Sequence, residues 1–151
     1  MKNYIQVNNF RKYISTPEIE LNDLNFFVGT NSSGKSTIVK SYLLIYNFLK
    51  SGKLFEIDFS DALYKDLNIQ DFKKQICQFS DNNDTMKFNV SLNDFNFELE
   101  IGEHQKSNFA KVLLFKITDL KNNIAYKYHF KKGNLMNLPI GYDFENNVME
   151  Y

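Results

Sequence analysis

The spacing of hydrophobic and polar residues changes along this chain, and each change predicts a different kind of element. Tyr4–Val7 alternates and predicts a short strand, and Glu18–Leu21 predicts a second, with Thr16-Pro17 as the break between them. Leu24–Val28 (LNFFV) is mostly apolar, which is typical of a strand buried on both faces. The first part of the chain therefore predicts three strands.

The spacing then becomes helical. Ser36–Leu49 places apolar side chains on one broad face, and Ser51-Gly52 marks the end of the predicted helix. Phe55–Phe79 mixes polar and apolar residues, and we expect a short helix around Asp71–Phe79. The apolar positions of the first helix are Ile38, Val39, Tyr42, Leu43, Ile45, Tyr46 and Leu49.

After the polar turn Asp81–Asp84 the period becomes two residues, as in strands with one buried face. The short polar connectors Asn93-Asp94 and Lys121–Asn123 indicate antiparallel hairpins. Leu135–Tyr151 carries no clear signal. Four strands are predicted here: Met86–Leu92, Phe95–Ile101, Lys111–Thr118 and Ile124–Phe130.

Between the apolar run and the helix lies Gly29–Thr37 (GTNSSGKST), which fits the P-loop pattern G-x-x-x-x-G-K-[ST] at every fixed position. Gly29 and Gly34 permit backbone angles closed to other residues, so the loop can wrap a phosphate. The loop N–H groups and the start of the helix attract an anion. Lys35 supplies a charge for the β- and γ-phosphates, and the Ser36 hydroxyl coordinates Mg²⁺.

The context of this motif favours a nucleotide site over a plain surface loop with a solvated lysine. The motif follows a buried-type strand and opens an amphipathic helix, which is the setting a P-loop requires. We therefore expect binding of ATP with Mg²⁺, with Lys35 as the catalytic residue and Ser36 as the metal ligand. The predicted nucleotide contacts in the loop are Gly29, Thr30, Asn31, Ser32, Ser33, Gly34, Lys35, Ser36 and Thr37.

The composition of the chain limits the partners and the cellular compartment that we expect. The chain has 151 residues with 18 basic and 18 acidic side chains, so no global charge marks a nucleic-acid or membrane binder. Its single cysteine, Cys77, cannot form an internal disulfide, which fits a reducing compartment. Met1–Phe10 lacks the apolar core of a signal peptide, and no apolar run is long enough to span a membrane. We expect a cytoplasmic protein.

Two segments resemble the opening of ABC-type ATPase heads, a group that includes the SMC, RecF and OLD-like AAA proteins. These segments are Asn8–Tyr13 (NNFRKY) and Phe27–Thr37 (FVGTNSSGKST). The Asn-Ser-Ser-Gly-Lys-Ser form is especially similar to bacterial OLD-like and AAA-15/AAA-21 ATPases, many of which work in phage defence, DNA repair or toxin–antitoxin-like systems. The close resemblance covers about residues 4–50, and beyond them it is architectural.

The resemblance implies a fold and further contacts. We expect an α/β fold in which residues 1–151 form one N-terminal ATPase-head segment, with an incomplete P-loop NTPase core over about residues 1–80 and an antiparallel β-sheet lobe over about 85–133. Asn31 and Ser33 would line the γ-phosphate side of the loop. Arg11, the single arginine, matches the family arginine near the nucleotide, although a solvated strand-end cation is an equal alternative. The family also has a glutamine that senses Mg²⁺ and water, for which Gln70, Gln75 and Gln78 are unassigned candidates.

The second half of an ABC head is missing from these residues. The apolar run Val112–Phe115 is followed by Lys116-Ile117 and not by the two acids of a Walker B strand, and no signature motif follows. Without those acids Mg²⁺ lacks a second protein ligand and water lacks a base, so we expect weak binding and little hydrolysis by these residues alone. In the family ATP is held between two heads, so a second head is the expected partner, and DNA or an effector protein is a possible one.

Two other classes compete with an ATPase segment. A small P-loop kinase gathers several arginines around the transferred phosphoryl group, and this chain has one. A nucleotide-dependent DNA- or protein-binding module without hydrolysis could use residues 106–132, which hold seven lysines against one acid, Asp119. We expect instead that these lysines form a solvated strand face opposite the acidic residues Asp94, Glu98, Glu100 and Glu103.

Overall fold

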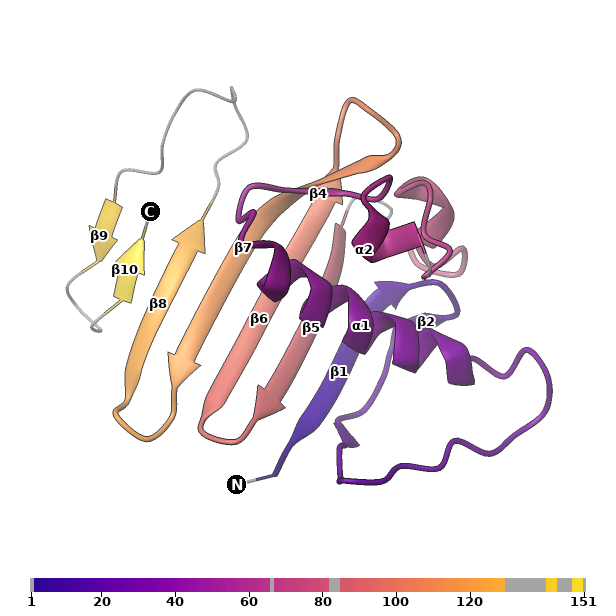
Figure 1. Cartoon of the computed structure of the whole chain (residues 1–151), viewed down its shortest axis with the longest axis horizontal. Coiled ribbons are helices and arrows are strands. Elements are labelled where there is room, and N and C mark those ends of the chain that lie inside the picture. The colour runs from indigo at the N-terminus through magenta and orange to yellow at the C-terminus, as the bar shows by residue number, and fades with distance from the viewer. Residues whose placement is uncertain (1, 66, 82–84, 130–140, 144–147, 151) are drawn as a thin grey trace.

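The structure, a computed structural model, describes residues 2–65, 67–81, 85–129, 141–143 and 148–150. One large sheet carries a long helix across one face (Figure 1). The helices are α1 Lys35–Ser51, α2 Ala62–Lys65 and the single 3₁₀ turn η1 Lys73–Gln75. The strands are β1 Tyr4–Phe10, β2 Tyr13–Ser15, β3 Ile19–Glu20, β4 Glu56–Asp58, β5 Thr85–Leu92, β6 Phe95–Glu103, β7 Phe109–Asp119, β8 Ile124–His129, β9 Gly141–Asp143 and β10 Val148–Glu150.

The sheet is mostly antiparallel. Its main order is β2-β1-β5-β6-β7-β8-β10-β9, and the β8–β10 pair is parallel. Because β1 pairs directly with β5, the first strand and the later meander belong to one sheet. The fold is therefore sheet-rich with one long helix and not clearly α/β, which corrects the expected fold class. The division into a nucleotide-binding core and a lobe stays a prediction.

Two short strands share one edge of β1. β2 pairs with the end of β1 and β3 with its beginning, and Thr16-Pro17 separates them as predicted. Thr16 is buried and bridges this break, because its backbone N–H donates to the Val7 carbonyl at 2.9 Å and its hydroxyl accepts from the Val7 N–H at 3.0 Å. The side chain thus satisfies a backbone donor that the interrupted strand would leave unpaired.

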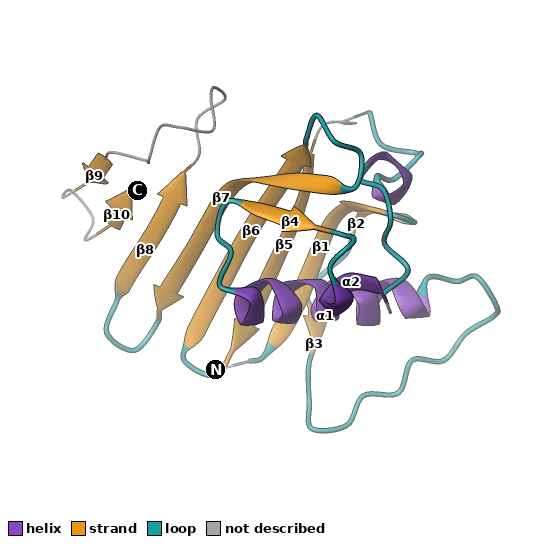
Figure 2. Ribbon diagram, turned by 45° about the horizontal axis from the view of Figure 1, so that its top comes forward, coloured by secondary structure: helices purple, strands orange, loops and turns teal. Residues whose placement is uncertain are grey.

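Helix α1 packs one apolar stripe on the sheet (Figure 2). Leu44, Ile45 and Phe48 are buried, at the spacing that places them on one helix face. The Phe48 ring meets Phe115 of β7 edge-to-face with a centroid distance of 5.1 Å. The helix ends where predicted, because Gly52 adopts the left-handed conformation with φ 65° that closes many helices.

The predicted buried strand Leu24–Val28 is wrong for the described residues. The segment forms no strand and runs as part of a long loop between β3 and α1 outside the sheet (Figure 2). Val28 is 89% exposed and Phe26 is 80% exposed. A strand requires a neighbour for its backbone N–H and C=O groups, and none of the described strands lies beside this segment.

The helix expected around Asp71–Phe79 is also wrong, since only the 3₁₀ turn η1 forms there. Phe72 and Cys77 are buried on either side of this turn. The chain then extends at Ile76, which forms an antiparallel bridge with Phe10 at the end of β1. Burial and this pairing outweigh the weak helical preference of the segment.

The four-strand meander is confirmed as β5 to β8, with both predicted hairpin connectors in place. Phe130, the predicted last residue of the fourth strand, lies outside the described residues. The strands β2, β4, β9 and β10 and the helix α2 were not predicted, and each has four residues or fewer. Among the described helices, none is long and apolar enough to cross a membrane.

Replacing Phe48 by alanine tests the helix–sheet packing. We expect Phe48→Ala to lower the free energy of unfolding by about 3–5 kcal/mol, because it removes a fully buried ring and leaves a cavity. Tyr46→Ala on the same helix is the matched control, because Tyr46 is 52% exposed and its loss should change stability by about 0.5 kcal/mol or less. Urea unfolding of both variants measures the difference, and equal losses would contradict this packing.

Candidate nucleotide site

The predicted P-loop forms a compact turn before α1. Gly29 and Gly34 both have positive φ values, 150° and 98°, and Ser32 has φ 65°. The Ser33 N–H donates to the Thr30 carbonyl at 3.3 Å, which closes the loop on itself. Positive φ values at positions 29 and 34 are adopted most easily by glycine, which explains the spacing of the two glycines in the motif.

The first turn of α1 is open to an anion. The helix has 17 residues, Gly34 occupies the N-cap without a side-chain cap, and the first turn contains no acidic residue. The positive end of the helix dipole therefore has no competing carboxylate in its first turn, where the Thr37 N–H already donates to the Gly34 carbonyl at 2.8 Å. The Ser36 hydroxyl is exposed at this point, and Thr37 beside it is buried.

Lys35 lies across its own loop. Its ammonium donates to the Gly29 carbonyl at 2.7 Å and the Thr30 carbonyl at 2.6 Å, and it lies 3.5 Å from the Ser33 hydroxyl. The lysine thus holds the two ends of the P-loop together. In this conformation the ammonium is held by the loop's own carbonyls, and a bound phosphate would have to replace these contacts.

The turn between β1 and β2 packs against the P-loop. The Lys12 ammonium donates to the Ser32 carbonyl, and the Tyr13 hydroxyl lies 3.5 Å from the Ser33 carbonyl. Tyr13 also covers Gly34 so closely that a Cβ placed on Gly34 would lie 2.5 Å from the tyrosine oxygen. The residues that follow the Asn-Phe-Arg sequence thus support the loop from one side.

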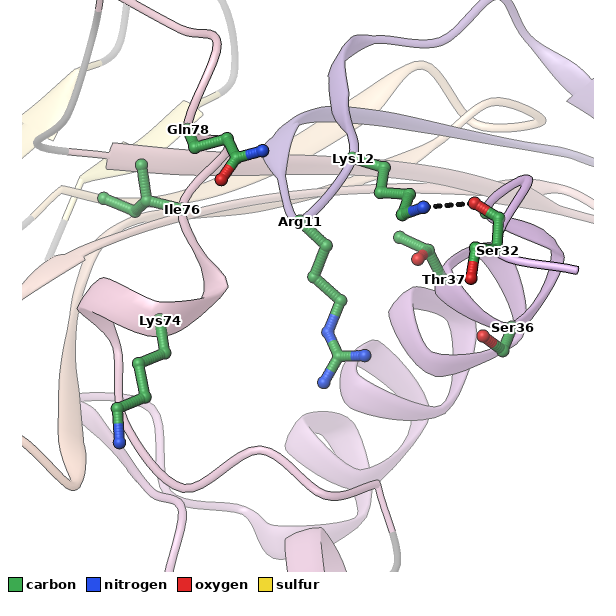
Figure 3. A pocket seen from close by; sticks show the side chains of 9 residues that line it. Arg11, Lys12, Ser32, Ser36, Thr37, Lys74, Ile76 and Gln78 are labelled. Carbon is green, nitrogen blue, oxygen red and sulfur yellow. Dashed lines mark hydrogen bonds between the residues drawn. The ribbon is translucent and has the colours of Figure 1, made fainter.

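A pocket of about 400 Å³ opens beside this contact (Figure 3). Figure 3 shows Arg11 reaching into it, with Lys74 on one side and helix α1 on the other. Among the described residues, no carboxylate lines the pocket. The lining residues come from the β1–β2 turn, the P-loop, the start of α1 and the segment after α2: Arg11, Lys12, Ser32, Gly34, Ser36, Thr37, Lys74, Ile76 and Gln78.

The electrostatics of the pocket favour an anion. Arg11 forms no ion pair with any described carboxylate, and its partial burial lowers its pKa. Burial and the charge of Arg11 together lower the pKa of Lys40, one turn along α1 from Ser36. Cations that disfavour one another in this way are stabilised when an anion binds between them.

The structure brings together only part of the predicted set. Arg11, Ser32, Gly34, Ser36 and Thr37 line the pocket. The other predicted contacts, Gly29, Thr30, Asn31, Ser33 and Lys35, lie in the loop and helix start without lining it. Their roles in nucleotide binding stay predictions.

Sequence reasoning missed the support from Lys12 and Tyr13, although their position next to Arg11 was a usable signal. It also missed Lys74 and Ile76, which lie far from the motif in the sequence and carry no pattern. The three candidate glutamines lie in different environments: Gln78 lines the pocket, Gln75 is buried against Arg11, and Gln70 is exposed.

The lysine-rich stretch lies on the meander. Lys116 contacts Glu98 at 2.9 Å across β6 and β7, and Lys87 of β5 contacts Glu100 at 3.2 Å. Lys106 packs over the Phe109 ring. Within residues 106–132 the printed ion pair is Lys116 with Glu98, so the solvated strand face stays a prediction for the other lysines, and those at 131 and 132 lie outside the described residues.

Among the described residues, no group of three or more histidine, cysteine or acidic side chains could hold a metal ion by itself. The exposed Ser36 hydroxyl is the group that fits the expected magnesium role, because it is a hard oxygen ligand at the mouth of the loop. A magnesium ion there would need phosphate oxygens and water for its remaining ligands.

Comparison with known proteins gives one match. A family model described as an AAA ATPase domain, AAA_15, matches residues 1–146. No curated protein and no solved structure shows a significant match to the chain. The match covers most of the chain and includes the P-loop and every described residue that lines the pocket.

Replacing Gly34 tests the geometry of the loop. We expect Gly34→Ala to lower the free energy of unfolding by about 1–3 kcal/mol, because alanine is strained at φ 98° and its Cβ displaces Tyr13. Gly52→Ala is the control, because it also has positive φ, 65°, but its Cβ would meet no atom within 4 Å. Urea unfolding should show the larger loss for Gly34→Ala and a reduced loss when Tyr13→Ala is added. A loss unchanged by Tyr13→Ala would contradict the close contact.

Proposed function

The chain belongs to the AAA ATPase domain family, and from this premise we propose that it binds ATP with Mg²⁺ through Gly29–Thr37. The observation that carries the proposal is the junction of an uncapped helix start with Arg11, Lys12 and Lys74 around one pocket that no described carboxylate lines. A triphosphate is a polyanion, and helix N-termini and cationic side chains are the groups that bind phosphate in proteins.

The parts of the loop take separate roles in this proposal. Lys35 contacts the β- and γ-phosphates, and the loop N–H groups surround them. Ser36 supplies one oxygen ligand to Mg²⁺, which neutralises phosphate charge when it is bound. Arg11, which points into the pocket from the β1–β2 turn (Figure 3), would contact the nucleotide.

The finer assignment is to the ABC-type heads of the OLD, RecF and SMC kind. The Asn-Phe-Arg opening and the Asn-Ser-Ser-Gly-Lys-Ser loop support it, and a second head that closes over the nucleotide would be the partner. A bacterial phage-defence or DNA-repair role, with DNA or an effector protein as a further partner, follows from that assignment alone.

Hydrolysis needs groups beyond those that line this pocket. A water nucleophile requires a residue that orients it, and Mg²⁺ in such sites has a carboxylate as a second protein ligand. The pocket presents cations, hydroxyls and the Gln78 amide. We therefore propose that these residues bind the nucleotide and that catalysis depends on acidic residues supplied from outside them.

A DNA-binding module remains the second candidate of the sequence. The cross-strand pairs of Lys116 and Lys87 with acidic residues reduce the free positive charge of the meander. Salt-sensitive DNA binding by this chain would favour that module. A small P-loop kinase is also disfavoured, because the chain holds one arginine.

Substitution of Lys35 tests nucleotide binding. We expect Lys35→Ala to weaken binding of Mg-ATP by about 10- to 100-fold, because it removes charge-assisted hydrogen bonds to phosphate. Lys50→Ala is the control, because Lys50 is an exposed lysine at the other end of the same helix. Titration calorimetry measures both affinities. Equal affinities of the two variants would refute a P-loop site.

The rate of ATP hydrolysis by this chain tests the proposal that its residues bind the nucleotide without catalysing its hydrolysis. We expect residues 1–151 to bind Mg-ATP and release phosphate at or near the uncatalysed rate, because the described lining of the pocket contains no carboxylate. A phosphate-release assay with Lys35→Ala as the background measures this. Turnover typical of a complete ATPase, of order 1 per second, that Lys35→Ala abolishes would contradict the prediction.

A further inference from the structure

Gln75 contacts Arg11 through two separate groups. Its backbone carbonyl accepts from the Arg11 N–H at 2.6 Å, and its side-chain oxygen accepts from the Arg11 Nε at 2.7 Å. Gln75 is only 5% exposed and lies 64 positions along the chain from Arg11. The Phe10–Ile76 bridge beside this contact holds the two backbones together.

These contacts orient the guanidinium without neutralising it. The Asn68 carbonyl accepts from Nη2 at 3.1 Å, so the remaining guanidinium N–H groups stay available to the pocket. Both acceptor residues are uncharged amides, and no described carboxylate pairs with Arg11. A carboxylate at position 75 would hold the same geometry but would cancel the charge that a phosphate needs.

We propose that Gln75 is a positioning residue that holds Arg11 in the pocket as a fully charged contact for the phosphate chain of the nucleotide. The proposal rests on the proposed function, because it names how one contact of that site is kept in place. It also separates two glutamines that the sequence could not separate: Gln75 acts through Arg11, whereas Gln78 faces the pocket itself.

The test titrates the 151-residue chain into an ATP analogue that carries a fluorescent label on the ribose, with Mg²⁺ present throughout. We expect Arg11→Met to weaken binding about tenfold or more, which is the size of a lost charge-assisted hydrogen bond. Gln75→Glu should weaken binding to a similar degree, although it keeps the acceptor and the fold. Gln70→Glu adds the same charge at an exposed position on the same segment and should leave affinity within about twofold.

A double-mutant cycle separates positioning from general stability. Gln75→Met should weaken binding in the native background and should have no further effect in the Arg11→Met background. Its effect on thermal stability should persist in both backgrounds, because the lost burial does not depend on the ligand. Inorganic tripolyphosphate as a competitor should lose affinity in Arg11→Met, and adenosine should not.

The outcomes distinguish the inference from the proposed function. If the native chain shows no binding that depends on Lys35, the proposed function fails and the role of Gln75 fails with it. If binding depends on Lys35 but Arg11→Met or Gln75→Glu binds like the native chain, only the inference is overturned. If Gln75→Met weakens binding equally in both backgrounds, Gln75 is structural and the inference is likewise overturned.

Discussion

The packing of α1 on the sheet is the constraint from which the geometry of the site follows. Leu44, Ile45 and Phe48 each bury a side chain against the strands, at about 1.5–3 kcal/mol for each residue. This burial determines where the helix axis lies, and therefore where its first turn lies. The first turn comes beside the end of β1, so the P-loop and the turn that carries Arg11 meet. Substitutions that disrupt the packing of α1 should therefore lower the affinity of any ligand that binds its first turn, since binding and folding are linked.

Contacts from distant segments also hold the end of β1 in an uncommon backbone conformation. Asn9 and Arg11, on either side of Phe10, both have φ 55°, a left-handed conformation that asparagine tolerates and that is costly for arginine. Three contacts determine this geometry: the Asn9 side chain donates to the Thr85 carbonyl at 2.6 Å, Phe10 packs on Phe88, and Gln75 accepts from Arg11. Because β5 and the segment around Gln75 supply these contacts, residues distant in sequence keep the arginine in the pocket. Strain that the surroundings maintain at this point fits a binding role for the turn.

The sequence predicted the local parts of this molecule and missed the parts that depend on distant partners. The helix from Ser36 and the meander were recognisable because each has its own period, and the P-loop because its spacing is specific. Leu24–Val28 has the composition of a buried strand, but composition cannot supply the neighbour that a strand needs. The contact of Gln75 with Arg11 was equally unpredictable, because it joins two segments across 64 positions and only the folded sheet brings them together.

The pocket carries local positive charge, although the chain as a whole has no net charge. The net charge is zero, yet the residues that the structure describes around the pocket include three cations and no carboxylate. Glu98 and Glu100 lie on alternate positions of β6 and pair with lysines directly across the sheet, on the face opposite the helix. Screening at physiological salt acts over about 8 Å, so charges already paired on that face contribute little at the pocket. A neutral protein can therefore present a locally positive site, and the local arrangement, more than the net charge, indicates what kind of ligand this chain binds.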